Sequence, residues 1–338
     1  MTGQRARTTA AFTIVEMLVV IGVLGLLLGI LLPALSGANR RSLKHKELNS
    51  LRQIGLAWTL YANSNNDKIL PGFLEVDLQS RWRVSYEYPY HHDVPPAPSY
   101  VVTAENPNIA GPWTWRLMPY MDFNHDVVHG YTDEPEFDAI TLGTDLAEAE
   151  DIAFRPAFGY NAFYVGGWWE MDDDNHARYR FFDATVDGIR RNVVSRSIGT
   201  IRRSTELLIY CSASLLEPGI YRSFRNDQPG WHYVVPPRLG TVVKWNSVGA
   251  KWTSVGGDSS VATAVSALFQ GSRSELEAGG SDPATLIVED RDAAPIGRYN
   301  RLAALLHADG HTATGTPGSL TDMRKWIDAA DSGRFFHD

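Results

Sequence analysis

Three short stretches of the sequence carry side chains that could bind a metal ion. His307, Asp309 and His311 alternate along the chain, so a single extended strand would place all three on one face, as a zinc site requires. Asp309 is followed by Gly310, however, and this pair is typical of the tight turn in a β-hairpin. A turn at that point breaks the alternation. The sequence therefore predicts a hairpin here and no metal ligand.

The other two stretches match metal sites less well. Asp172–His176 resembles the start of a calcium-binding EF-hand loop, but Ala177 occupies the position at which that loop needs a glycine. His91–Asp93 lies among tyrosines and is typical of a loop. The sequence has no nucleophile elbow, phosphate-binding loop, dinucleotide fingerprint or zinc-protease helix. The absence of these motifs favours a protein that is not an enzyme and has no cofactor.

The overall composition is that of a folded protein. The chain has 338 residues, of which 44% are hydrophobic and 21% charged, and these values exclude a disordered, collagen-like or coiled-coil chain. Its formal net charge of −8 gives nucleic acids no general electrostatic reason to bind, so we expect no nucleic-acid partner. The single cysteine, Cys211, cannot form an internal disulfide, and its apolar neighbours predict a buried strand position.

One carboxylate stands at the edge of a long apolar run. Glu16 directly precedes Met17–Leu35, a stretch of 19 residues without a charge. As a helix, residues 12–35 would be about 36 Å long, which is enough to cross a hydrocarbon layer of about 30 Å. A carboxylate inside that layer costs about 2.5–3.5 kcal/mol. The sequence therefore predicts one membrane-spanning helix, with an acidic group that needs a partner.

Two interpretations of this N-terminal region leave part of it unexplained. A secretory signal peptide would account for the basic start and for the small residues Ser36–Ala38, but its apolar core is usually 7–15 residues long. A plain membrane anchor accounts for the length but gives Glu16 no role. A third interpretation explains both the length and the carboxylate.

The stretch Ala11–Ile21 resembles the N-terminal signature of type IV prepilins and type II secretion pseudopilins. The resemblance implies that a membrane prepilin peptidase cuts the Ala11–Phe12 bond on the cytoplasmic side and methylates the new amine of Phe12. The residue before the cut is usually glycine in this family, and Ala11 is also small. Glu16 matches the family's carboxylate, and Pro33 matches a proline at which the helix is thought to melt during assembly.

The carboxylate also has a physical role that does not depend on the resemblance. Cleavage would create an α-amino group with a reference pKa of about 7.7–8.0, which is largely protonated at neutral pH. The amine of one subunit can then neutralise Glu16 of its neighbour and offset the cost of burying either charge alone. We therefore expect Glu16 and Pro33 to act in subunit assembly. The alternative is that Glu16 snorkels at the membrane edge, close to Thr13, with its carboxylate in the polar region.

The helical pattern continues beyond the membrane span. Apolar residues recur every three or four positions at Leu48, Leu51, Ile54, Trp58 and Tyr61, which defines one face that can dock on a globular head. The polar stretch 63–67 ends the helix.

From residue 68 onward, short β-prone runs alternate with turn residues. We expect an α+β, pilin-like fold in which a long N-terminal helix, first membrane-embedded and then docked, packs on a sheet-rich head. The predicted parts are a leader (1–11), a transmembrane and stalk helix (12–66) and a β-rich head with insertions (67–338). The predicted strands are 204–212, 230–235, 240–245 and 284–288, and the predicted helices of the head are 258–269 and 320–330. Segments 111–121, 158–161, 204–208 and 299–311 resemble the large prepilin-like proteins of planctomycetes.

The resemblance implies a structural subunit of a type IV pilus or a type II secretion pseudopilus, and both remain open. Its partners would be the prepilin peptidase, the membrane and other pilin or pseudopilin subunits. The head would lie on the periplasmic side of the inner membrane or, after assembly, in an extracellular filament. Arg40, Arg41, Lys44 and Lys46 after the span outnumber Arg5 and Arg7 before it, and the positive-inside rule taken alone would reverse this orientation. The alternative function is a membrane-anchored binding or enzymatic ectodomain.

Overall fold

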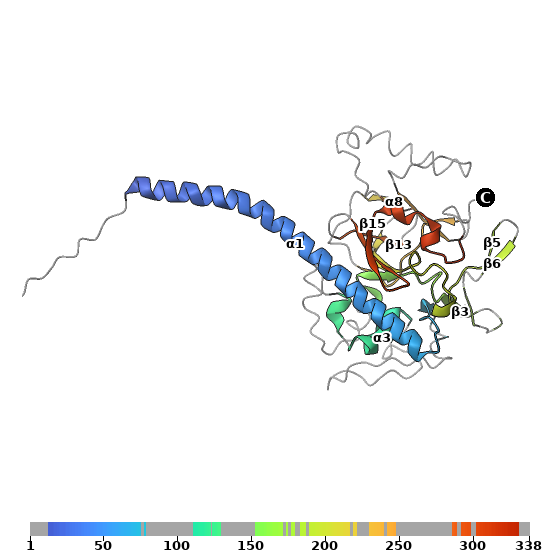
Figure 1. The fold of residues 1–338 in the computed structure, drawn as a ribbon. Coiled ribbons are helices and arrows are strands. Elements are labelled where there is room, and N and C mark those ends of the chain that lie inside the picture. The colour runs from blue at the N-terminus through green and yellow to red at the C-terminus, as the bar shows by residue number, and fades with distance from the viewer. Residues whose placement is uncertain are drawn as a thin grey trace, which may run out of the picture. The chain divides into compact units, whose positions relative to one another are not determined.

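The computed structural model describes residues 13–75, 78, 111–122, 124–129, 153–171, 174, 177–179, 183–186, 189–216, 219–221, 230–239, 242–247, 286–288, 292–298 and 302–330. The chain divides into two compact units, Met1–Leu43 and Lys44–Asp338. The structure combines a long N-terminal helix with a sheet-rich region in the second unit (Figure 1). The predicted α+β class is therefore correct at this level.

Helix α1 (Ile14–Ser64) has 51 residues and contributes to both units. Its large hydrophobic side chains from Ile14 to Leu35 are all exposed, with exposed fractions between 49% and 85%. This part of the helix is long and apolar enough to cross a membrane. The helix ends in the predicted polar stretch, where Asn66 and Asp67 adopt positive φ angles of 55° and 60°.

The second half of α1 is a docked helix within the second unit. The side chains of Leu51, Ile54 and Trp58 are buried, as the spacing predicts, while Leu48 and Tyr61 are half-buried. Gly55 lies on the same face, and a Cβ atom there would come within 3.0 Å of Cδ1 of Leu306. The absence of a side chain at Gly55 therefore lets the helix backbone approach the sheet closely.

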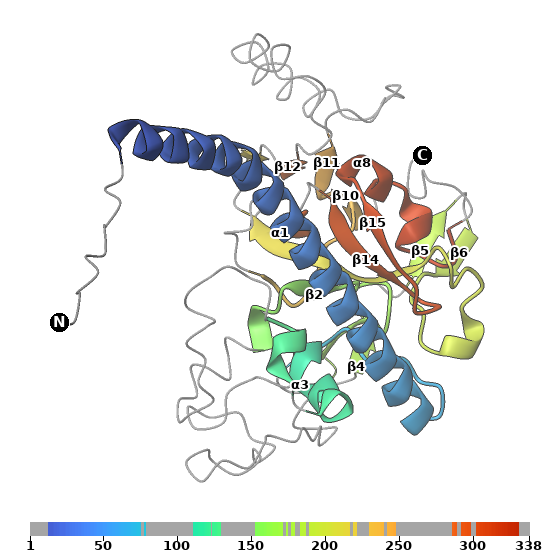
Figure 2. The same cartoon turned by 60° about the vertical axis from the view of Figure 1, so that its left-hand side comes forward.

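The sheet under this helix is antiparallel and centres on β7 (Leu208–Leu216). Strand β14 (Ala303–His307) pairs with β7 and with β15 (Thr312–Gly315). Strands β2 (Phe158–Tyr160) and β13 (Asp292–Pro295) pair with successive stretches of β7. Figure 2 shows the second half of α1 crossing in front of β14 and β2.

The two faces of the sheet pack against different partners. Along β14, Leu306 meets the docked helix at Gly55, whereas Ala303 and Leu305 join a core on the opposite side. That second core contains Trp245 and Trp326, whose rings meet edge to face at 6.3 Å. Both indole nitrogens donate to backbone carbonyls, so the rings are buried without an unpaired N–H.

The remaining elements are short. Helix α3 (Trp113–Leu117) is followed by the 3₁₀ turns η1 (Met118–Met121) and η2 (His125–Val127), and η3 spans Ile198–Thr200. Two minor sheets have three strands each: one contains β1 (Phe73–Leu74), β3 (Trp168–Met171) and β4 (Ala177–Tyr179), and the other contains β8 (Gly219–Tyr221), β11 (Trp245–Ser247) and β12 (Leu286–Val288). Two further sheets have two strands each: β5 (Asp183–Val186) pairs with β6 (Ile189–Asn192), and β9 (Arg238–Leu239) pairs with β10 (Val242–Val243).

The predicted helix over 320–330 is wrong. Helix α8 (Pro317–Leu320) ends where this prediction begins, and a 3₁₀ turn, η4 (Met323–Lys325), follows it. Asp322 interrupts the helix because its backbone is extended, with a ψ angle of 111°, and its side chain accepts a hydrogen bond from the amide of Arg324. Trp326 and Ile327 are nevertheless buried, so the apolar spacing marked core positions without a continuous helix.

The predicted strands fare unevenly. Strand β7 covers the end of the predicted 204–212 run and extends beyond it, and β12 lies within 284–288. Residues 230–235 form no strand and contribute one isolated bridge, from Tyr233 to Tyr160. The predicted helix 258–269 lies outside the described residues, as do the tyrosine-flanked histidines 91–92 and the acidic stretch 133–151.

Candidate functional site

The first candidate site is the N-terminal end of α1. Ala11 and Phe12, the predicted cleavage and methylation residues, lie outside the described residues. Thr13 precedes the helix and bonds reciprocally with Glu16. The amide and the hydroxyl of Thr13 each donate to Oε2 of Glu16 at 2.8 Å, and the Glu16 amide donates to Oγ1 of Thr13 at 3.3 Å. This is a capping box.

The capping box determines where the Glu16 carboxylate lies. It folds back over the first turn towards the amide of Thr13, the residue that directly follows Phe12. Sequence reasoning placed Glu16 near Thr13 but missed the reciprocal bonding, although a threonine three residues before a glutamate is its recognised signal. The carboxylate therefore has a local hydrogen-bonding partner in Thr13.

Pro33 lies within helix α1, and the backbone is helical on both sides of it. Proline supplies no amide hydrogen, so one hydrogen bond of the helix ladder is missing at this position. The role of Pro33 in assembly stays a prediction.

The second candidate site fastens α1 to the sheet. The ammonium of Lys44 lies 3.1 Å from Oε2 of Glu47 and donates to the carbonyl of Leu302 at 2.6 Å. The other carboxylate oxygen of Glu47 accepts from the hydroxyl of Ser212 at 2.6 Å. Ser212 in turn accepts from the amide of Ala304 at 2.9 Å. Glu47 and Ser212 are fully buried and Lys44 is 6% exposed, so this polar cluster lies inside the head.

This burial sets Lys44 apart from the other three cations that follow the apolar run. We predicted Lys44 as one of four cations that flank the span, and it is instead committed to a buried ion pair. Three of the four positions, Arg40, Arg41 and Lys46, are exposed. The positive-inside rule counts lysines and arginines and not net charge, so all four residues still oppose the expected orientation.

The outer face of the docked helix carries a short apolar stripe. Leu56 is 66% exposed and Leu60 is 48% exposed. Among the described residues outside the apolar span of α1, these are the exposed large hydrophobic side chains. They stand four positions apart and therefore lie side by side on one helix face. A pair of this kind can pack against another helix.

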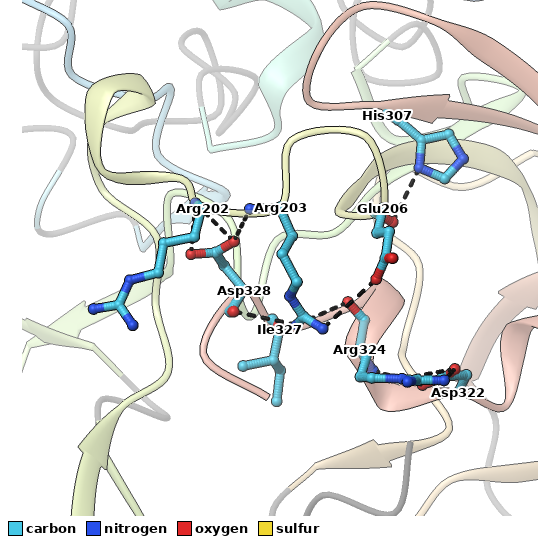
Figure 3. Close-up of polar contacts among 8 residues, drawn as sticks. All are labelled: Arg202, Arg203, Glu206, His307, Asp322, Arg324, Ile327 and Asp328. Atoms are coloured by element: carbon cyan, nitrogen blue, oxygen red, sulfur yellow. Dashed lines mark hydrogen bonds and ion pairs between the residues drawn. The ribbon is translucent and has the colours of Figure 1, made fainter. Parts of the chain in front are cut away.

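The predicted hairpin at the third candidate site is confirmed. Strands β14 and β15 are joined through Gly310, which has a φ angle of +87°. The hairpin stacks the rings of His307 and His311 at 4.3 Å, with an angle of 4° between their planes. Nδ1 of His307 lies 3.0 Å from the carbonyl oxygen of Glu206 (Figure 3). Nδ1 of His311 lies 2.6 Å from Oδ1 of Asp309.

This geometry does not form a metal centre. The lone pairs of two stacked, nearly parallel rings lie in separate parallel planes and cannot converge on one ion. In the part of the chain that the structure describes, no group of three or more histidine, cysteine, aspartate or glutamate side chains is placed to hold a metal. Of the EF-hand-like stretch, only Asp174 is described.

A clasp of hydrogen bonds joins the segment 322–328 to the loop before β7 (Figure 3). The Asp328 carboxylate accepts from the amides of Arg202 and Arg203 at 2.9–3.1 Å. The guanidinium of Arg203 donates to the carbonyls of Arg324, Ile327 and Asp328. Each of these bonds joins a side chain to a backbone group, so the clasp holds the segment 322–328 against the loop before β7.

No protein-family model matches this chain, and no curated protein or solved structure is detectably similar to it.

Proposed function

We propose that the protein is a structural subunit of a type IV pilus or a type II secretion pseudopilus. It is anchored by the first half of α1, cut after Ala11, methylated on Phe12 and assembled through α1. The resemblance of residues 11–21 to the prepilin signature motivates this proposal.

The observation that carries the proposal is that the two parts of α1 have different surroundings. The first part of α1 exposes every large apolar side chain from Ile14 to Leu35, whereas the part from Lys44 onward is built into the head. An apolar helix of this length needs either lipid or other helices around it. A subunit that leaves the membrane to join a filament exchanges the first environment for the second.

Two further observations support the proposal. The Glu16 carboxylate is directed towards the residue that would follow the new amine, where it can meet a positive charge. Leu56 and Leu60 place an exposed apolar stripe on the docked half of the same helix. A helix that is apolar in its first part and exposes leucine side chains on the outer face of its docked part is suited to packing against copies of itself.

Mass spectrometry of the N-terminus of protein purified from its own host tests the proposal. We expect a chain that begins with methylated Phe12. A chain that begins at Asn39 would identify a secreted protein, and an intact Met1 would identify a plain membrane-anchored ectodomain with a binding or enzymatic head. Either result would overturn the proposed function.

A further inference from the structure

Arg116 is a charged side chain inside the head. It lies on α3 and is 6% exposed. Its Nε donates to the carbonyl of Pro112 at 3.1 Å, and its Nη2 donates to the carbonyls of Pro71 and Gly111 at 2.9 Å each. All three acceptors are neutral. They satisfy three of the five guanidinium hydrogens but carry no negative charge that would balance the cation.

The remaining edge of the guanidinium is unused. Nη1 of Arg116 is buried and has no hydrogen-bond partner, and it carries the other two hydrogens. No carboxylate of the described residues forms an ion pair with Arg116. A buried ion without a partner is strongly unfavourable, and burial accordingly lowers the pKa of Arg116. A native fold that keeps such a group requires an explanation.

A second unpartnered donor belongs to the same cluster. The Tyr210 side chain is fully buried, and its hydroxyl has no partner. Its ring packs on Trp113, one turn before Arg116 on α3, at 4.9 Å, and it stacks on Tyr160 at 4.6 Å. The Tyr160 hydroxyl donates to the carbonyl of Leu70, next to the Pro71 carbonyl that Arg116 uses. Tyr210 is therefore held between two neighbours of the guanidinium.

The nearby titratable groups do not supply the missing negative charge. Burial raises the pKa of Tyr210 well above 10, so its hydroxyl is a neutral donor. Burial and the charge of Arg116 lower the pKa of His232 to about 3, so this imidazole is also neutral. Within the described part of the chain, the groups around this cation are thus neutral aromatic residues and backbone carbonyls.

We propose that the free edge of Arg116 and the hydroxyl of Tyr210 bind a small inorganic anion of the halide class, such as chloride, inside the head. A water molecule would satisfy hydrogen bonds but would leave the charge uncompensated. A monatomic anion accepts hydrogen bonds from both donors, compensates the charge and needs little space. The site is independent of filament assembly, so it can exist whether or not the proposed function is correct.

The test compares the thermal unfolding of the full-length protein in detergent at equal ionic strength in sodium chloride and in sodium gluconate, whose anion is too large for a closed interior. We expect the melting temperature in 0.2 M chloride to exceed that in gluconate by about 3 °C or more. Arg116→Gln, which removes the charge, and Tyr210→Phe, which removes only one hydroxyl, should abolish or reduce this difference. Tyr164→Phe is the matched control, because the Tyr164 hydroxyl donates to the carbonyl of Arg238.

Bromide-soaked crystals of the wild-type protein provide a readout that does not depend on the folding of a variant. Anomalous scattering should place bromide within about 3.5 Å of Nη1 of Arg116. An equal melting temperature of the wild type in both salts, or a water molecule without anomalous signal at Nη1, would overturn the proposal. A chloride effect of the same size in Tyr164→Phe, Tyr210→Phe and Arg116→Gln would do so as well, because it would reflect a general salt effect.

Discussion

Lys44 and Glu47 form a buried ion pair one turn apart on α1, with 3.1 Å between the ammonium and the carboxylate. Ser212, on the central strand β7, holds the second carboxylate oxygen of Glu47. The pair therefore links the helix to the middle of the sheet and not to its edge. Buried polar groups of this kind can specify a single packing arrangement even where they add little net stability.

The first prediction concerns this pair. Lys44→Met should destabilise the head by about 3–5 kcal/mol, because it leaves the Glu47 carboxylate buried without its cation. Ser212→Ala should cost about 1–3 kcal/mol, since it removes one hydrogen bond to that carboxylate. Urea unfolding of the full chain, followed by tryptophan fluorescence, measures both. The double variant Lys44→Met/Glu47→Leu should recover most of the loss, and a double variant as unstable as Lys44→Met alone would contradict this account.

The second prediction separates two roles of Glu16. Glu16→Gln retains an acceptor for the capping box but removes the charge, whereas Thr13→Ala removes a capping partner and keeps the charge. If charge pairing drives assembly, Glu16→Gln and Glu16→Ala should both insert into the membrane yet lose most filament incorporation. Thr13→Ala should assemble nearly normally. Quantitative blotting of membrane and filament fractions measures these outcomes, and normal incorporation of Glu16→Gln would refute the pairing role.

The third prediction concerns the outer stripe of the docked helix. Replacing Leu56 and Leu60 together by serine should leave the melting temperature within about 2 °C of the wild type, because both side chains are exposed. It should reduce filament incorporation if the stripe contacts a neighbouring subunit. Leu51→Ala, on the buried face of the same helix, should instead destabilise the head by about 2–5 kcal/mol. An unstable Leu56→Ser/Leu60→Ser variant would show that the stripe is part of the fold.

The fourth prediction concerns pH. Burial, and secondarily the stacked ring of His311, lower the pKa of His307 from 6.5 to about 4. Between these values the unfolded chain binds a proton that the folded chain excludes, so the stability that His307 contributes is lost as the pH falls from about 6.5 towards 4.

His307→Gln should therefore reduce the difference in urea midpoint between pH 7.5 and pH 5. His45→Gln, at an exposed position of α1, should leave that difference unchanged. An undiminished acid sensitivity in His307→Gln would show that other groups, such as the buried His232, account for it.

The sequence predicted the elements that depend on local pattern. The spacing of Leu51, Ile54 and Trp58 identified the buried face of α1, and Asp309-Gly310 identified the hairpin. It could not show that Lys44 and Glu47 are buried, because their partner Ser212 is 165 residues from Glu47. A charged residue in a helix looks the same in the sequence whether it faces water or a distant strand.

The failure at 320–330 has a different cause. The apolar positions Leu320, Met323, Trp326 and Ile327 repeat at a helical spacing, and all of them are buried. The side chain of Asp322 competes for the backbone within this run, and its local hydrogen bond prevents a continuous helix. Periodicity therefore located the core but not the backbone conformation.

The uninterrupted course of α1 from Ile14 to Ser64 has a mechanical consequence. A force on the helix would be resisted within the second unit, where the Lys44 ammonium donates to the carbonyl of Leu302. The hydrogen bond between Glu47 and Ser212 would transmit this force to β7, the central strand, which is paired along both edges. The force is thus distributed over several paired strands, so it does not separate a single edge strand from the sheet.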